Sequence, residues 1–218
     1  MASWVLKAMD LACQKAHRTL FDSVSFSVAP GHWLHIEGGN GCGKTSLLRI
    51  LCGLAPASQG KVHWSNPLNV TSQDEPIHRP DRSVLHYIGH ALGLKTDLSA
   101  CENLCMDAHI GGLHLTQAQA LQALEAQGLK SRAHLPVRVL SQGQRQGVAL
   151  ARLRTSTAPL WVLDEPLVGL DALATDTTRD LMQKHLAQGG AIVLTSHHNV
   201  QLQGPGAHYR LDRGASPA

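Results

Sequence analysis

Gly38-Gly39-Asn40-Gly41-Cys42-Gly43-Lys44-Thr45 is the stretch that decides the fold of this chain. It fits the pattern of a glycine, four residues and then Gly-Lys-Ser or Gly-Lys-Thr, which wraps the phosphates of a nucleotide. Segment 32–36 before it alternates as a strand does, and segment 46–51 after it has the pattern of a helix. Because the motif requires a strand before it and a helix after it, the sequence favours a phosphate-binding loop over a glycine-rich turn that binds nothing.

The residue types of this loop suit a nucleoside triphosphate. Its four glycines let the backbone approach the phosphates and turn N–H groups inward, and the following helix adds a partial positive charge beneath them. We expect Lys44 to reach the β- and γ-phosphates and Thr45 to ligate Mg²⁺. The residues predicted to bind ATP are Gly38, Gly39, Asn40, Gly41, Cys42, Gly43, Lys44, Thr45 and Ser46.

The composition bounds the size of the fold and the class of its partners. With 218 residues and 23.4 kDa, the chain suits one domain with a full hydrophobic core and no separate regulatory domain. Its 19 basic and 16 acidic side chains are too balanced for a protein that wraps nucleic acid, so no nucleic-acid partner is expected. Charges interrupt the apolar N-terminal stretch and no later run approaches a membrane span, so the sequence predicts a soluble, cytoplasmic chain.

The cysteines predict neither a disulfide framework nor a zinc site. They number five, an odd set without a Cys-x-x-Cys pair, so reduced thiols are expected. Cys42 stands at a helix start beside a lysine, where thiols become reactive, but a small residue that fits the loop is the favoured interpretation. The 14 histidines are scattered along the chain, which favours surface positions over metal or haem ligation.

Apolar runs and alternation predict an α/β fold. Strands are expected at residues 4–8, 24–28, 32–36, 60–62, 84–89, 160–163 and 191–195. The run 160–163 is fully apolar, which is typical of a central parallel strand buried on both faces. Segment 65–82, rich in Pro, Asp, Asn and His, predicts a solvated loop, and 173–188 predicts an amphipathic helix.

Between residues 99 and 154 the sequence favours helices. Three pairs have the spacing of the capping box, in which a hydroxyl and a carboxylate or amide satisfy N–H groups at a helix start: Ser99 with Glu102, Thr116 with Gln119, and Ser141 with Gln144. Gly128 is expected to end the helix 117–127. We therefore predict one domain, 1–218, with its core at about 1–90 and 155–218 and an inserted helical subdomain at about 91–154.

Polar side chains follow two of the predicted buried strands. Asp164 and Glu165 come directly after the strand 160–163, and His197 follows the strand 191–195. Sheets of this class bind ligands at the carboxyl ends of their strands, and phosphoryl transfer requires positioning and charge neutralisation. We expect Asp164 to hold Mg²⁺, Glu165 to orient or deprotonate the attacking water, and His197 to contact the γ-phosphate. Alone, an acidic pair could be a helix cap and a histidine structural, but the upstream phosphate loop favours catalysis.

A second helix start carries an anion-binding signal. The pentapeptide Leu140-Ser141-Gln142-Gly143-Gln144 opens a predicted helix at 145–153, and its N-terminus exposes the Ser141 hydroxyl and the Gly143 N–H. This pentapeptide resembles the signature of ABC-type ATPases, usually Leu-Ser-Gly-Gly-Gln. With the phosphate loop, the carboxylates after strand 160–163, Gly169-Leu170-Asp171 and His197, the resemblance covers nearly the whole chain.

The resemblance implies a P-loop NTPase fold of the α/β class: an ABC nucleotide-binding domain with a RecA-like core, an antiparallel β subdomain and an inserted α-helical subdomain. It also implies a head-to-tail homodimer, with ATP and Mg²⁺ as cofactors. In that dimer the signature of one copy contacts the γ-phosphate held by the other, through Ser141, Gln142, Gly143 and Gln144. Asp171 would couple the two sites, and the helical subdomain would transmit motion to integral membrane subunits.

Three positions depart from the family pattern. Gln142 replaces the first signature glycine, which we expect to be tolerated because Gly143 keeps its N–H donor. His90 stands where the family usually has the glutamine that senses Mg²⁺ and meets the membrane subunit, so coupling is predicted to weaken at acidic pH, where the ring is protonated. No aromatic residue near 15–17 matches the one that stacks on adenine in many relatives, so base selectivity is expected to be loose or to come from Phe21.

Further stretches narrow the resemblance to the ATP-binding subunit of the bacterial cytochrome c biogenesis system, the haem exporter family. They are Ile36-Glu37-Gly38, 44–49, Tyr87-Ile88-Gly89-His90, 94–98 and 102–104. This implies a peripheral place on the cytoplasmic face of the bacterial inner membrane and ATP hydrolysis coupled to haem delivery or to release of a haem-loaded chaperone. Haem-handling proteins are indirect partners, so no histidine is assigned to haem. An exporter of another small-molecule or lipid cargo, and a clamp without turnover, remain alternatives.

Overall fold

The computed structural model describes residues 5–15, 18–65, 80–197 and 200–212. Its strands are β1 (Leu6–Lys15), β2 (Arg18–Val28), β3 (Trp33–Glu37), β4 (Gln59–Trp64), β5 (Leu85–Ile88), β6 (Leu160–Asp164), β7 (Ala191–Thr195) and β8 (Gly206–Arg210). Its α-helices are α1 (Lys44–Leu51), α2 (Ala100–Ile110), α3 (Gln117–Glu125), α4 (Gln142–Ala151) and α5 (Ala172–Ala187). Short 3₁₀ helices are η1 (Lys130–Arg132), η2 (Val137–Val139) and η3 (Arg152–Thr155).

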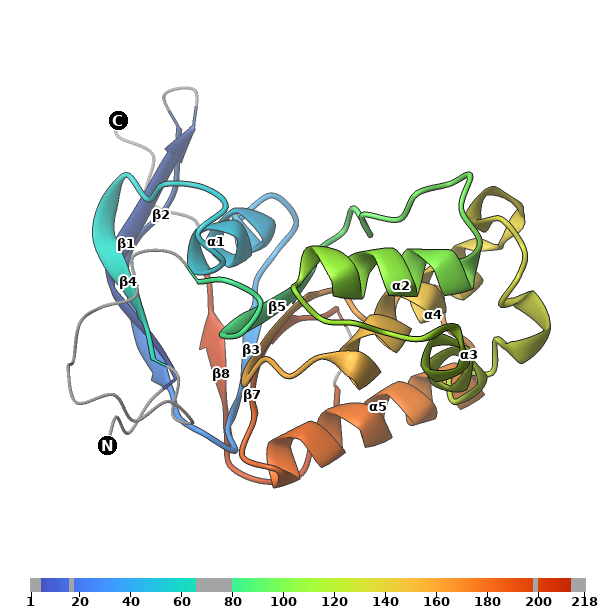
Figure 1. The fold of residues 1–218 in the computed structure, drawn as a ribbon. Helices are drawn as coiled ribbons and strands as arrows, with labels where there is room; N and C mark the ends of the chain where they lie inside the picture. Colours follow the sequence, from blue (N-terminus) through green and yellow to red (C-terminus); the bar gives the residue numbers. More distant parts are fainter. Residues whose placement is uncertain (1–4, 16–17, 66–79, 198–199, 213–218) are drawn as a thin grey trace.

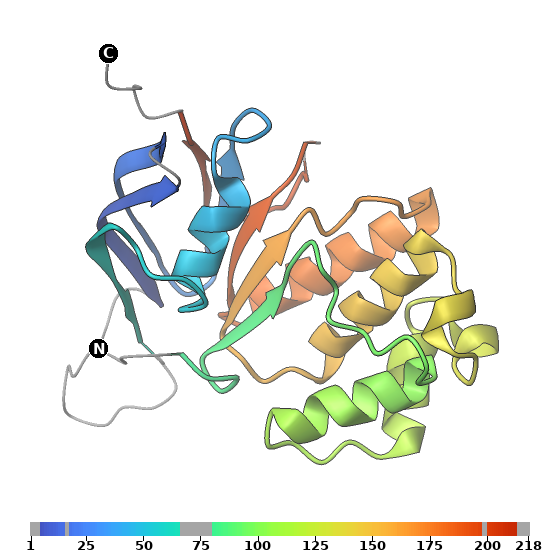
Figure 2. The same cartoon turned by 90° about the horizontal axis from the view of Figure 1, so that it is seen from above.

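Two sheets enclose helix α1 (Figures 1 and 2). The smaller sheet is antiparallel with the order β2-β1-β4, and the larger one is parallel with the order β5-β6-β7-β3-β8. The buried side chains of α1 join one apolar cluster with residues of both sheets; they are Leu47, Leu48, Ile50 and Leu51. This packing fixes the start of α1 at one end of the parallel sheet, directly after β3.

Strands β6 and β7 are buried along their whole length, as their unbroken apolar sequences predict. Side chains on opposite faces of β6 serve two cores: Leu160 and Val162 pack with α1, whereas Trp161 and Leu163 pack under α4 and α5. On that second face the ring of His185 stacks on Trp161, with 3.7 Å between centroids, and burial lowers the pKa of His185 to about 4. These two strands are therefore covered on both faces, and only their ends can carry chemistry.

The helices α2, α3 and the following turns have an apolar cluster of their own, on the side of the molecule away from the antiparallel sheet (Figure 1). The capping boxes at Ser99, Thr116 and Ser141 all form, which confirms the three predicted helix starts. The inserted helical subdomain of the predicted fold class is thus confirmed, while its limits at about 91 and 154 stay a prediction.

One buried carboxylate connects this helical part to the parallel sheet. Asp107 on α2 accepts hydrogen bonds of 2.6 and 2.8 Å from Arg82, which precedes β5, and one of 3.1 Å from Arg152 at the end of α4. Burial by itself raises the pKa of Asp107, but the hydrogen bond from Arg82 and the charge of Arg152 outweigh it and hold that pKa below its usual range. The carboxylate therefore stays ionised and ties three segments together.

The sequence patterns missed β8 and shortened the first two strands. Strand β8 pairs with β3 at the edge of the parallel sheet and leaves most of its side chains exposed, so it needs no apolar run. Strands β1 and β2 extend well beyond the predicted 4–8 and 24–28, because irregular pairing of β1 between Ala8 and Leu11 breaks the alternation. Most of the predicted loop 65–82 lies outside the described residues.

Candidate nucleotide site

Strand β3 leads directly into the glycine-rich loop, and α1 begins at its end. Gly38 and Gly43 have φ angles of 153° and 108°, in the region that favours glycine. A Cβ atom on Gly38 would lie 2.7 Å from the carbonyl oxygen of Leu211, and one on Gly43 would lie 3.0 Å from the ring of Phe21. At these two positions the predicted phosphate loop therefore has backbone angles that require glycine, and it packs closely against neighbouring segments.

The N-terminus of α1 lacks a side-chain cap. Its N-cap is Gly43, and its first turn holds no acidic residue. The other described α-helices begin at a side chain that accepts a hydrogen bond from their own first turn, namely Ser99, Thr116, Ser141 and Asp171. Lys44 lies over the loop and donates to the carbonyl oxygens of Gly38 at 2.6 Å and Gly39 at 3.4 Å. The ammonium group of Lys44 and the uncapped N–H groups of α1 lie side by side, and together they can donate hydrogen bonds to a phosphate.

Thr45 and Asp164 meet at the carboxyl end of the parallel sheet. The hydroxyl of Thr45 donates to Oδ2 of Asp164 at 2.9 Å, and the hydroxyl of Thr195 donates to Oδ1 at 2.7 Å. Thr195 was not among the predicted site residues, although a hydroxyl at the end of a neighbouring buried strand is a signal that indicates it. Asp164 is 4% exposed. This pairing of a hydroxyl with a carboxylate supplies the oxygen donors that Mg²⁺ prefers.

Glu165 is held in a backbone conformation that is uncommon for residues other than glycine. Its φ angle is 53°, and its N–H group donates to the backbone oxygen of Thr195 at 3.2 Å and to its hydroxyl at 3.0 Å. The N–H group of His197 donates to Oε2 of Glu165 at 3.1 Å, and Nε2 of His197 lies 3.5 Å from Oε1. That Oε1 atom is buried and accepts no hydrogen bond from the described residues. The two predicted catalytic side chains thus come together, with one carboxylate oxygen left for a further donor.

The predicted signature residues form the start of α4. Ser141 accepts from the N–H of Gln144 at 3.2 Å, and the amide oxygen of Gln144 accepts from the N–H of Ser141 at 3.0 Å. Gly143 packs against the loop that follows β6, where an added Cβ would lie 2.2 Å from the carbonyl oxygen of Gly169. Asp171, predicted to couple the sites, caps α5 by accepting from its first turn at 2.8 Å. Gln142 is exposed.

The expectation that Phe21 contacts the base is wrong. Its side chain is 1% exposed and belongs to the core beneath the phosphate loop, so its ring has no face to offer to adenine. Of the other candidate region, 15–17, residues 16 and 17 lie outside the described residues.

Cys42 is buried against Gly38, which supports its interpretation as a small packing residue. His90 is exposed, two residues beyond the end of β5.

These elements define a class of protein. Three features make up a P-loop nucleotide-binding domain: a parallel sheet with a phosphate loop after β3, a hydroxyl and carboxylate pair at the start of α1 and the end of β6, and a helical insertion that includes the start of α4 at Ser141. The family described as ABC transporter matches residues 21–168. A cytochrome c biogenesis ATP-binding export protein of Nitrosospira multiformis is 41% identical over 91% of this chain and 94% of its own length. The protein of the same name from Pseudomonas aeruginosa is 42% identical over 91% of this chain and 96% of its own length.

The chain therefore belongs to the ABC transporter family and, within it, to the cytochrome c biogenesis ATP-binding export proteins. It is an ATPase of the ABC type and binds nucleotide.

Solved structures agree with this fold. A putative ABC transporter ATP-binding protein from Pyrococcus furiosus has a TM-score of 0.78 over 94% of this chain and 96% of its own, at 20% identity. An ATP-binding cassette bound to ADP and phosphate, in a dimeric post-hydrolysis state, has a TM-score of 0.76 over 88% of both chains, at 21% identity. At these identities the likeness is one of fold. In the part of the chain that the structure describes, the helices are too short or too polar to cross a bilayer.

Proposed function

We propose that this chain is the ATP-hydrolysing subunit of an inner-membrane complex for cytochrome c biogenesis, and that hydrolysis is coupled to haem delivery or to release of a haem-loaded chaperone. The shared name of relatives that match nearly end to end supports the process. The observation that carries the chemistry is the contact between Glu165 and His197 at the same sheet end as the contact between Thr45 and Asp164.

The residues at this end of the sheet have separate roles in the proposed phosphoryl transfer. Lys44 and the N–H groups of the phosphate loop would bind and orient the triphosphate, and Thr45 with Asp164 would hold Mg²⁺. The metal, when bound, neutralises charge on the phosphate oxygens. Glu165 accepts a proton from the attacking water, or orients it, through the buried oxygen that has no donor among the described residues. His197 holds the other oxygen of this carboxylate through its N–H group.

Two copies of the chain are proposed to close over ATP. The start of α4, with Ser141, Gln142, Gly143 and Gln144, would then face the γ-phosphate bound by the other copy. Three observations support this arrangement: the signature helix is already capped, Ser141 and Gln142 are exposed, and a solved ATP-binding cassette of the same fold is dimeric. Asp171 would couple the sites from the start of α5.

Integral membrane subunits and a peripheral place on the cytoplasmic face of the inner membrane complete the proposal. His90, exposed beyond the end of β5, is proposed to meet such a subunit. Isolation of the complex from membranes, with mass identification of its subunits and a search for a haem absorbance band, tests the cargo. Partners that handle haem support cytochrome c biogenesis, whereas partners without haem favour another small-molecule or lipid cargo.

The substitution Glu165→Gln tests the catalytic assignment. Glutamine keeps the size of the side chain and loses its basic oxygen, so phosphate release by the purified complex should fall by about 100-fold or more. ATP-driven dimerisation should persist, because the phosphate loop is unchanged. Equal hydrolysis by the wild type and the variant would show that another group activates water, and loss of ATP binding would show a structural role instead.

A further inference from the structure

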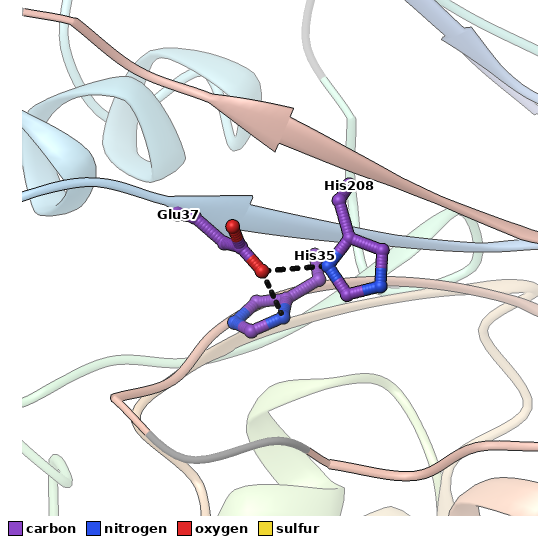
Figure 3. A group of neighbouring side chains, drawn as sticks. All are labelled: His35, Glu37 and His208. Atoms are coloured by element: carbon purple, nitrogen blue, oxygen red, sulfur yellow. Dashed lines mark hydrogen bonds and ion pairs between the residues drawn. The ribbon is translucent and has the colours of Figure 1, made fainter.

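Two histidines and a glutamate gather at the start of the phosphate loop (Figure 3). His35 and Glu37 lie two residues apart on β3, and His208 lies on β8 opposite His35 in the parallel register. Oε1 of Glu37 lies 2.6 Å from Nδ1 of His208 and 3.4 Å from Nδ1 of His35. Across the described ranges, this is the one group of three or more His, Cys, Asp or Glu side chains whose ligand atoms all lie within 4.8 Å of each other.

The hydrogen bond on the far side of His35 defines which nitrogen faces the glutamate. Its Nε2 lies 3.0 Å from the backbone oxygen of Ser196, and since a carbonyl oxygen only accepts, Nε2 carries a hydrogen. In the neutral ring Nδ1 then presents a lone pair to the carboxylate of Glu37. Two electron-rich atoms face each other at 3.4 Å, an arrangement that a cation between them stabilises. A ring N–H bonded to a backbone carbonyl is also how proteins orient metal-binding histidines.

We propose that His35, Glu37 and His208 form a binding site for a divalent transition-metal ion of the Zn²⁺ type, with His35 Nδ1, Glu37 Oε1 and His208 Nδ1 as ligands. Two imidazoles and one carboxylate suit this class of ion, whereas Mg²⁺ and Ca²⁺ prefer oxygen ligands. The separation of 3.4 Å between the first two atoms is that of two ligands on a tetrahedral ion with bonds of about 2.1 Å.

A metal ion can enter this site, and the three ligands can close around it, without a change of fold. The side chains of Glu37 and His208 are 44% and 51% exposed, so an ion enters from solvent, while His35 is buried at 4% and forms the floor. In the metal-free state Nδ1 of His208 donates a hydrogen bond to Glu37. On metal binding that hydrogen moves to Nε2 of His208 or leaves as a proton, and the two side chains separate slightly to admit the ion. The nearby charge of Arg210 is paired with Asp212 at 3.3 Å, which reduces its repulsion of a cation.

The position of this cluster connects it with the nucleotide site. Glu37 directly precedes Gly38, and its backbone oxygen accepts from the N–H of Leu211 at 2.8 Å. His35 holds the backbone oxygen of Ser196, the residue before His197. A bound ion would therefore fasten β8 to β3 and stiffen both the start of the phosphate loop and the segment that carries His197. Nothing in this inference depends on the proposed transport function, because the site is formed by one chain without nucleotide.

The test is a titration of the full-length chain, stripped of metal by a chelator, first with Co²⁺ as a spectroscopic probe and then with Zn²⁺ in competition. One equivalent of Co²⁺ should give the visible absorption of a four-coordinate nitrogen and oxygen site, which Zn²⁺ removes and excess Mg²⁺ does not. The variants His208→Asn and Glu37→Gln should each bind at least about tenfold more weakly. The matched control His114→Asn removes an exposed histidine far along the chain and should bind as the wild type does.

A second measurement separates this site from adventitious binding and from misfolding. Zn²⁺ should raise the thermal midpoint of the wild type and of His114→Asn but not of the two site variants, whose midpoints without metal confirm that they fold. If either variant fails to fold, nitrogen ligation of Zn²⁺ in the wild type by X-ray absorption decides the question. Equal affinity in all four proteins, a sulfur-to-cobalt charge-transfer band in place of nitrogen ligation, or no binding at all would overturn the proposal.

Discussion

The starts of α1 and α4 are both proposed to face phosphate, yet they satisfy their backbone groups in opposite ways. Helix α1 begins at Gly43 without a side-chain cap, whereas α4 begins at Ser141 inside a complete capping box. The bare helix start leaves N–H groups for a ligand and adds the charge of Lys44. The capped start is finished in the absence of ligand, so its shape is preformed. In the proposed dimer, the bare start would belong to the half-site that binds ATP and the capped start to the half-site offered to the other copy.

Of the changes that test this difference between α1 and α4, removal of the charge at the start of α1 should have the largest effect, which is a loss of ATP affinity. Lys44→Ala removes the ammonium that lies over the loop, and we expect ATP to bind about 100-fold more weakly, which corresponds to about 3 kcal/mol. Titration with a fluorescent nucleotide measures the loss. Arg49→Ala, which removes an exposed charge from the last turn of the same helix, is the matched control. A similar loss in both variants would mean that general positive charge, and not the loop, binds the phosphates.

Filling the space behind the capped helix start should have the next largest effect. A Cβ on Gly143 would lie 2.2 Å from the backbone oxygen of Gly169, so Gly143→Ala forces α4 away from that loop at a cost of about 1–3 kcal/mol. Thermal unfolding measures this cost, and light scattering with ATP should show loss of the dimer. In Gly147→Ala, on the same helix, the new atom would lie 3.0 Å from the side-chain end of the buried Leu129 and meet no backbone atom, so the loss of stability should be smaller than in Gly143→Ala. An intact ATP-driven dimer in Gly143→Ala would argue against the proposed interface.

Removing the cap itself distinguishes structure from function. Ser141→Ala and Thr116→Ala each delete the hydroxyl of a capping box, and each should lower stability by about 1 kcal/mol. Because Thr116 opens α3 and has no proposed contact with phosphate, only Ser141→Ala should also slow ATP hydrolysis beyond that stability loss. Phosphate release measured at a temperature where both variants are fully folded decides this. Equal hydrolysis would reduce Ser141 to a helix cap.

The smallest effect concerns pH, and it must be separated from the stability of the fold. Burial lowers the pKa values of His86 and His185 to about 4, below the ordinary value of about 6.5 in the unfolded chain. The unfolded state thus binds more protons, so the stability that these residues contribute is complete above about pH 6.5 and is lost as the pH falls toward 4. The whole fold therefore loses stability in this range.

A comparison of the wild type with His90→Gln removes that shared effect. At acidic pH the wild-type complex should lose coupling of hydrolysis to its membrane subunits more steeply than His90→Gln, because glutamine does not take up a proton. The readout is the stimulation of phosphate release by the membrane subunits. Two identical pH profiles would assign the whole effect to the fold, and His90 would have no role in coupling.

Sequence reasoning succeeded where a feature depends on residues close together in the chain. The phosphate loop, the three capping boxes and the apolar strand β6 each require only a few neighbouring residues. It failed where distant segments meet. The edge strand β8 lacks an apolar pattern, and Phe21 is buried because the phosphate loop packs over it. The cluster of His35 with His208 joins residues more than 170 positions apart, which no local pattern reveals.

The backbone conformation of Glu165 is a further feature that depends on a distant segment and could not be predicted from the sequence. Its positive φ angle depends on the two hydrogen bonds to Thr195 on the neighbouring strand, and the letters Asp-Glu-Pro give no sign of it. The residue type and its position at the strand end could be predicted, whereas the direction of its side chain could not. The limits of the helical subdomain, about 91 and 154, also remain a prediction, because α4 contributes side chains to two apolar clusters: Leu150 to the one under the sheet and Val148 to the one of the helical part.

The carboxylate of Asp107 has a mechanical consequence. Apolar surfaces can slide and repack under load, whereas a doubly hydrogen-bonded ion pair keeps both its length and its direction. A partner that pushes on α2 therefore moves Arg82 by way of Asp107, and with it the start of β5, the strand that ends just before His90. This ion pair is therefore a direct contact by which a displacement of α2 would reach the parallel sheet.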